Sequence, residues 1–156
     1  MGLRTAGTQL YYIDPADGQI QTITCVTSIN GLDTTLDQID VTCLEDLDRR
    51  YQAGLGNPSA FTFGIQYDPA DSSHAKIAAL FNSRLTTDWA IGYSDGTAAP
   101  TVTDGELVLP TSRSFTLIEG YVASFPLEFE LNEVVRSEIS VQVSGPVVTV
   151  PRTVTP

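Results

Sequence analysis

The chain has very few of the residues that usually carry catalysis or bind metals. Its 156 residues include one histidine and two cysteines. Cys25 and Cys43 match no zinc or redox spacing, so we expect two buried free thiols rather than a disulfide. His74 has no second ligand nearby in the sequence, and we expect a solvent-exposed helix residue rather than a base. The sequence therefore predicts no catalytic, metal-binding or cofactor-binding residue.

Basic residues are also scarce. Eight lysines and arginines face 19 acids, which gives a formal net charge of −11. Between Arg4 and Arg49 there are eight acids and no base. Because phosphate binding requires Lys or Arg to displace counterions, this balance excludes a nucleic-acid-binding protein. An acidic surface favours solubility, and a surface built to repel a polyanion is the alternative.

Long apolar runs are absent. A run such as "VVTV" (147–150) is far too short to span a bilayer, so we expect no membrane insertion. The first ten residues lack the apolar core of a secretory signal. These two features predict a soluble, intracellular product.

Alternation of apolar and polar residues dominates what is present. Each alternating segment has one apolar face, which is typical of antiparallel strands in a β-sandwich or barrel-like sheet. A turn is expected between the first two, at "DPADGQ" (14–19). The expected strands are residues 8–13, 20–29, 60–67, 87–93, 114–125 and 138–145.

One helix is expected at about residues 69–85, on the flank of the sandwich. Asp68 is suited to the N-cap and Pro69 to the first helical position. Apolar residues then recur at helical spacing: Ile77, Leu80, Phe81 and Leu85.

"FPLEFEL" (125–131) reads as a further half-buried strand. Its acids, Glu128 and Glu130, would share one face of that strand, and its apolar residues would share the other.

Three segments lack a clear pattern. A long loop is expected at 30–58 and a turn-rich connection at 94–112, in which "ELVL" suggests a short strand. The proline-rich end, residues 146–156, predicts an extended arm. Loops this long are uncommon in compact domains unless they serve a partner or a site.

The stretch "TCLEDLDRRYQAGLGNP" (42–58) is the densest in charge and glycine. Leu44, Leu47 and Tyr51 have helical spacing, and Glu45–Arg49 and Asp46–Arg50 are i,i+4 pairs. So short a helix is not stable alone, and the segment therefore needs a surface to dock on, which another copy would supply. A loop that becomes ordered only on a neighbour is the alternative that we favour.

The order of several segments resembles the tail tube proteins of long-tailed, non-contractile bacteriophages. These segments are "VTCLEDLDRRYQAGLGNPSAFTFGIQYD", "AALFNSR", "TTDWAIGYSDG" and "SFTLIEGYVASFPLEFELNEVVRSEISVQVSG". The similarity covers roughly residues 5–145, which would form a single tail-tube domain, with 146–156 as a C-terminal arm. Some relatives carry an additional immunoglobulin-like domain, and we expect none here.

The resemblance implies a structural virion protein and not an enzyme. Six copies would form a ring, and stacked rings would form the tube through which the genome is ejected into the host. DNA would pass without specific binding. The expected partners are further copies and the tape-measure, tail-terminator and tail-tip proteins, with assembly in the host cytoplasm and no cofactor.

The resemblance also suggests which residues matter. The long loop would reach a neighbouring subunit, and Arg49 and Arg50 would meet acids there, with intramolecular pairing as the alternative. The predicted interface residues are Leu44, Leu47, Arg49, Arg50, Tyr51 and Leu55. A basic bore would retain DNA, and strand alternation alone, not the resemblance, selects Glu119, Glu128 and Glu130 as the predicted lumen-facing or near-lumen acids.

Two other functions fit the sequence less well. The chain would form the tube of a related injection machine, namely a gene transfer agent, a phage-tail-like bacteriocin or a secretion system. A monomeric β-sandwich that binds carbohydrate or protein is the second alternative. That module would expose aromatic residues on loops, whereas Phe61, Phe63 and Trp89 occupy alternating strand positions.

Overall fold

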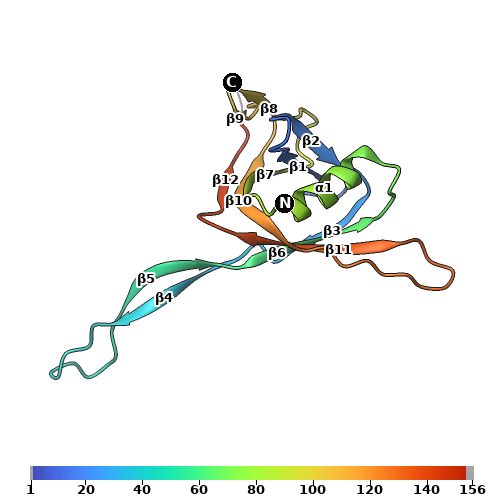
Figure 1. Cartoon of the computed structure of the whole chain (residues 1–156). Coiled ribbons are helices and arrows are strands. Elements are labelled where there is room, and N and C mark those ends of the chain that lie inside the picture. The colour runs from blue at the N-terminus through green and yellow to red at the C-terminus, as the bar shows by residue number, and fades with distance from the viewer. Residues whose placement is uncertain (1, 154–156) are drawn as a thin grey trace.

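The computed structural model describes residues 2–153, which form antiparallel strands around a single α-helix (Figure 1). The elements are β1 (Gln9–Ile13), β2 (Ile20–Ile23), β3 (Val26–Asn30), β4 (Thr34–Asp40), β5 (Tyr51–Pro58), β6 (Ala60–Gln66), α1 (Ser72–Ser83), β7 (Thr87–Gly92), β8 (Thr101–Thr103), β9 (Glu106–Val108), β10 (Phe115–Ser124), β11 (Arg136–Val143) and β12 (Val148–Val150). The expected mainly β architecture with one flanking helix is confirmed.

The main sheet has the order β2-β1-β7-β10-β11-β6-β3, with β12 also paired to β10. The expected single strand at 20–29 is wrong, because the chain bends at Cys25, whose φ is 57°. β2 therefore pairs with β1 at one end of the sheet, and β3 pairs with β6 at the other. The bend folds the sheet back on itself into two layers.

β10 belongs to both layers. Its first half pairs with β7 and β12, and its second half pairs with β11 from Gly120 onward, with a register shift between Val122 and Ser124. The first layer comprises β2, β1, β7 and the first half of β10, and the second layer comprises the second half of β10, β11, β6 and β3.

Trp89 of the first layer joins the two layers at the core. Its ring centroid lies 6.0 Å from that of Phe61 and 5.9 Å from that of Phe63, both in the second layer. Its indole Nε1–H donates to the Gly120 carbonyl at 3.2 Å. The inward faces expected from alternation are confirmed for these residues and for Ile65, Ile91, Ile139, Val141 and Val143.

Helix α1 begins at Ser72, later than expected, and its N-cap is Asp71 rather than Asp68. The Asp71 carboxylate accepts hydrogen bonds from the Thr24 hydroxyl and from Ser73, which lower the pKa of Asp71 to about 2 and keep the cap ionised. Ile77 and Leu80 are buried in the core. Leu85 is not, since the helix ends at Ser83.

His74 is 1% exposed, so the expectation of a solvated residue is wrong. Its Nδ1 accepts the Asp68 N–H at 3.0 Å, and its Nε2 lies 2.8 Å from the Thr24 carbonyl. These partners require a neutral imidazole with its proton on Nε2. The ring therefore links the start of the helix to the corner between β2 and β3.

The two cysteines were expected to be free and buried. Both are free, but both are exposed.

Residues 94–112 fold across the outer side of the first layer. The expected strand in "ELVL" is β9, which pairs with β8. Leu107 and Leu109 pack against a second apolar cluster of Tyr11, Ala90 and Phe115. The first layer is thus covered on both faces.

Arg113 is the buried anchor of this cover, at 1% exposed. Its guanidinium lies near the Tyr11 and Phe115 rings, at 5.8 and 5.6 Å from their centroids. Every acceptor it contacts among residues 2–153 is neutral: the carbonyls of Gly7, Gly92, Tyr93 and Ala98, the side-chain oxygen of Gln9 and the hydroxyl of Tyr11. One side chain therefore joins the N-terminal segment, β1, the end of β7 and the 94–112 segment.

We expect Arg113→Leu to lower the free energy of unfolding by about 3 kcal/mol, because it leaves several buried acceptors without a donor. Chemical denaturation of the unassembled protein measures this. Arg4→Leu removes the same charge from an exposed position and should change stability by less than about 0.5 kcal/mol. Equal effects of the two substitutions would contradict the anchoring role.

Candidate assembly interface

A two-stranded arm projects from the second layer (Figure 1). The chain that forms the β3–β6 pair continues outward and pairs again as β4–β5. We call residues 34–58 the arm and 41–50 its tip loop. The idea of a short helix in 42–58 is wrong: Leu44 and Leu47 lie in the tip loop, and Tyr51 begins β5. The two strands of the arm are paired within the chain, and whether the tip loop becomes ordered only on a neighbour stays a prediction.

The base of the arm is fixed by a compact hydrogen-bonded turn. Asp33 N–H donates to the Gly31 carbonyl at 2.8 Å, and Ser59 N–H donates to the Asp33 carbonyl at 3.1 Å. The Ser59 hydroxyl also lies 3.0 Å from both carbonyls. Gly31 has φ +86°, and a Cβ there would lie 2.8 Å from the Ala60 carbonyl oxygen. Only glycine fits this position, which sets the direction of the arm.

The arm exposes large apolar side chains. Leu44, Leu47 and Leu55 are each at least 80% exposed. Tyr51, Leu36 and Ile39 are also exposed. The structure thus brings all six predicted interface residues onto one projecting element. Exposed apolar side chains concentrated on one element are typical of surfaces that contact another chain.

The two arginines of the arm make only weak intramolecular ion pairs. Arg50 pairs with Asp46 at 3.7 Å, as the spacing suggested. Arg49 pairs with Asp40 across the hairpin at 3.5 Å, rather than with Glu45. Both arginine side chains are more than 70% exposed, and pairs this exposed contribute little to stability. Both cations remain accessible to a partner.

A second projection lies at the opposite end of the molecule from the arm (Figure 1). It is the loop 125–135 between β10 and β11, which we call the distal loop. The expected half-buried strand at 125–131 is wrong, and its only ladder contact is an isolated bridge between Glu128 and Arg136. Phe125 turns inward against Phe81, Pro126 follows it, and the chain leaves the sheet there.

The distal loop is also apolar and acidic. Phe129 and Leu131 are 73% and 91% exposed. Glu128 and Glu130 lie between apolar neighbours on the same loop and are exposed. The strand geometry that suggested a shared lumen face for these two acids is therefore absent.

The outer face of the second layer is uncovered and carries mostly polar side chains, together with Tyr121, which is 41% exposed and lies opposite Gln142. Thr62, Ser140 and Gln142 lie half-buried on it, and Glu138 and Ala123 are exposed. Glu119 is also exposed and lies on β10 opposite Asp88 of β7. Glu138 was not among the predicted acids. The outward alternation of Ser140 and Gln142 was the signal that could have identified it.

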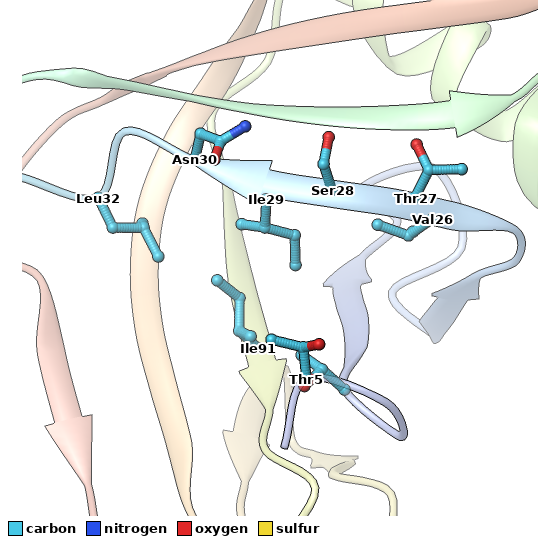
Figure 2. A pocket seen from close by; sticks show the side chains of 9 residues that line it. Thr5, Val26, Thr27, Ser28, Ile29, Asn30, Leu32 and Ile91 are labelled. Atoms are coloured by element: carbon cyan, nitrogen blue, oxygen red, sulfur yellow. The ribbon is translucent and has the colours of Figure 1, made fainter. Parts of the chain in front are cut away.

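An open cleft of about 450 Å³ runs along the free edge of β3 (Figure 2). Ile29 of β3 and Ile91 of β7 point toward each other across it, and Thr5 of the N-terminal segment borders it. Among the described strands β3 pairs only with β6. The lining has no charged side chain, so the cleft offers an unpaired strand edge rather than reactive groups.

Neither a metal-ligand cluster nor a helix that could span a membrane is found in residues 2–153. Residues 2–153 contain no cluster of three or more potential metal ligands. Within the same range no helix has the length and hydropathy needed to cross a membrane.

We expect Gly31→Ala to destabilise the protein more than Gly105→Ala. Both glycines have positive φ, at +86° and +79°, but a Cβ at Gly105 meets open space. The Gly105 substitution should therefore cost only the strain of positive φ, about 1–2 kcal/mol, and Gly31→Ala should add the clash at the base of the arm. Thermal and chemical unfolding compare the two, and equal losses would show that the arm base is not rigid.

Comparisons with known proteins identify the family of the chain. The family model described as "Phage tail tube, TTP, lambda-like" matches residues 1–153. "Structural protein 3" of Pseudomonas phage PAJU2 is 44% identical over 155 residues, covering 96% of this chain and 94% of that protein.

Solved structures show the same fold at low sequence identity. The tail of an empty gene transfer agent particle, refined with C6 symmetry, has a TM-score of 0.70 at 12% identity and covers 96% of this chain and 99% of its own. The SPP1 tail tube has a TM-score of 0.69 at 10% identity, covering 97% and 80%. A sheath/tube terminator of an extracellular contractile injection system has 0.69 at 13% identity, covering 96% of each chain.

The family model spans nearly the whole chain, the sequence identity to the phage relative is high enough to establish homology, and the fold is that of tail tubes. The chain belongs to the lambda-like phage tail tube family and is a structural protein of the virion tail.

Proposed function

We propose that six copies of this tail tube protein close into a ring, and that stacked rings form the conduit through which the genome leaves the virion. The similar fold in a gene transfer agent tail refined with C6 symmetry supports six-fold rings. The arm is the single observation that carries the proposal. A protein that acted alone would gain nothing from a rigid, apolar projection.

Ring closure also gives a role to the free edge of β3. An unpaired strand edge is a liability in a monomer, and pairing it with a neighbouring subunit removes that liability. The proposed pairing would cover the cleft beside β3, whose uncharged lining suits a contact between subunits. Every copy would then contribute its second layer to one continuous sheet around the bore.

The uncovered face of the second layer is the surface best suited to line that bore. Its mostly uncharged side chains offer DNA few cations. Arg136 at the end of β11 pairs with Glu133, and Arg84 lines a pocket with Tyr121 and Ala123 beside this face. Glu138 on this face, and Glu119 at its margin, would repel the polyanion. Glu128 and Glu130, on the distal loop, stay candidates for a position near the bore. DNA would therefore pass without specific binding.

The proposal includes partners beyond further copies of the chain. A tube of defined length requires a tape-measure protein inside it and terminator and tip proteins at its ends. Assembly in the host cytoplasm, without a cofactor and without an enzymatic role, completes the proposal.

A second candidate function is the tube of a related injection machine, such as a gene transfer agent, a bacteriocin or a secretion system. The fold similarity to the gene transfer agent tail favours it over a monomeric binding module. The exposed apolar side chains of this chain lie on an arm and a loop at opposite ends, rather than around one concave site.

Negative-stain microscopy of the purified protein tests the proposal. We expect rings or long hollow tubes, and a compact monomer at all concentrations would overturn it. Arg49→Glu with Arg50→Glu should leave a folded monomer that does not polymerise, because the only cations of the arm would become anions. The matched control reverses two exposed bases elsewhere, Arg4 and Arg84, and should still polymerise. Normal tubes from the Arg49/Arg50 variant would show that the charges of these two arginines are not required for assembly.

Reversing an acid on the bore face should slow DNA release. We expect phage carrying Glu138→Lys to assemble tails and to eject DNA more slowly, since six added cations per ring would attract phosphate. Glu106→Lys, on β9 over the first layer, is the matched control and should eject at the normal rate. Ejection can be followed by dye binding to released DNA, and unchanged kinetics for Glu138→Lys would count against this face as the bore.

A further inference from the structure

The most exposed apolar side chains of the molecule fall in two places only. Among residues 2–153, the large apolar side chains that are at least 73% exposed are Leu44, Leu47, Leu55, Phe129 and Leu131. The first three lie on the arm, and the last two lie on the distal loop. The chain itself therefore leaves the apolar side chains of both projections uncovered.

The two projections offer charges of opposite sign at particular positions, although the tip loop also carries Glu45, Asp46 and Asp48. The tip loop presents Arg49 and Arg50 beside Leu47. The distal loop has no base, and it presents Glu128 and Glu130 on either side of Phe129. Four of the six other bases are engaged elsewhere: Arg113 is buried, Lys76 pairs with Asp14 and Asp17, Arg136 pairs with Glu133, and Arg152 donates to the Asp95 carbonyl.

The projections also lie at opposite ends of the molecule (Figure 1). A contact between two different surfaces of one chain is heterologous, so every copy keeps one free arm and one free loop and the contact propagates. A contact between two arms would be isologous and would close after two copies. The separation of the two projections thus favours the geometry that a tube requires.

We propose that the arm tip of one copy docks on the distal loop of a second copy, with Leu44 and Leu47 against Phe129 and Leu131, and with Arg49 and Arg50 facing Glu128 and Glu130. This inference rests on the proposed tube and deepens it by naming the receiving surface. The apolar side chains supply the buried area, and the ion pairs set the register.

Cross-linking through introduced cysteines tests the contact directly. Cys25 and Cys43 are both exposed, so they are first replaced by serine. Leu47→Cys and Phe129→Cys are then combined in one chain, and assembled tubes are treated with a short bis-maleimide. We expect a ladder of covalent multimers on a denaturing gel, since each copy would link to two neighbours. Each single-cysteine variant should give monomers.

Three results of this experiment separate the possibilities. Dimers from Leu47→Cys alone would show an arm-to-arm contact and overturn the proposal. Absence of a ladder from the double variant, in tubes that form normally, would show that the arm docks elsewhere, for instance along the cleft beside β3. If the unmodified protein forms no tubes at all, the proposed function fails, and with it the contact that rests on it.

A charge exchange provides an independent test that does not depend on a cross-linker. Arg49→Glu with Arg50→Glu should block assembly, and so should Glu128→Arg with Glu130→Arg, because each would place like charges together. The four substitutions combined should restore tubes to at least half of the normal yield. Folded quadruple variants that stay unassembled, or either double variant assembling normally, would refute the pairing of these residues.

Discussion

The structure depends on one strand pair that does not stop at the edge of its sheet. β3 and β6 pair inside the second layer, and the same two segments of chain pair again as β4 and β5 beyond it. β4 and β5 satisfy each other's backbone hydrogen bonds, so the strands of the arm are held within the chain itself. Leu55 is thus presented to solvent on paired strands, and Leu44 and Leu47 lie on the loop that joins these strands, so assembly would have to order only the tip loop.

The position of the arm depends on how firmly the two layers of the sheet are packed together. Trp89 packs between Tyr12 of its own layer and Phe61 and Phe63 of the other. Arg113 fixes the 94–112 segment against the first layer through neutral acceptors. Burial of its charge is unfavourable, and the many hydrogen bonds of the guanidinium offset that cost. The turn at Gly31 and Ser59 then transfers this fixed geometry to the base of the arm.

Strand alternation predicted much of the core, because one buried face leaves a period of two in the sequence. Phe61, Trp89, Ile139 and Val141 all lie inward as expected. The bend at Cys25 was missed, since nothing in "IQTITCVTSI" marks a residue with positive φ. His74 was missed because its partners are backbone groups of Asp68 and Thr24, and Arg113 because its acceptors are mostly carbonyls. Backbone acceptors leave no signature in the sequence.

The candidate site was only partly predictable for a related reason. Leu44, Leu47 and Tyr51 have helical spacing by chance, and the pairing of β4 with β5, with a register shift opposite the glycines of β5, decides their conformation instead. In "FPLEFEL" the alternation is genuine, but the chain has left the sheet at Pro126, so no partner strand is present for it. In both cases the local pattern lacked information about long-range partners. Both segments expose apolar side chains, which is why they are the candidates for contacts between copies.

Amide hydrogen exchange in unassembled and assembled protein tests the central claim most directly. Residues 41–50 and 125–135 should exchange rapidly before assembly and become strongly protected in tubes, because each would be covered by another copy. The β8–β9 hairpin, over the first layer, should change little. Tubes in which the tip loop and the distal loop exchange as fast as in the free protein would contradict the account.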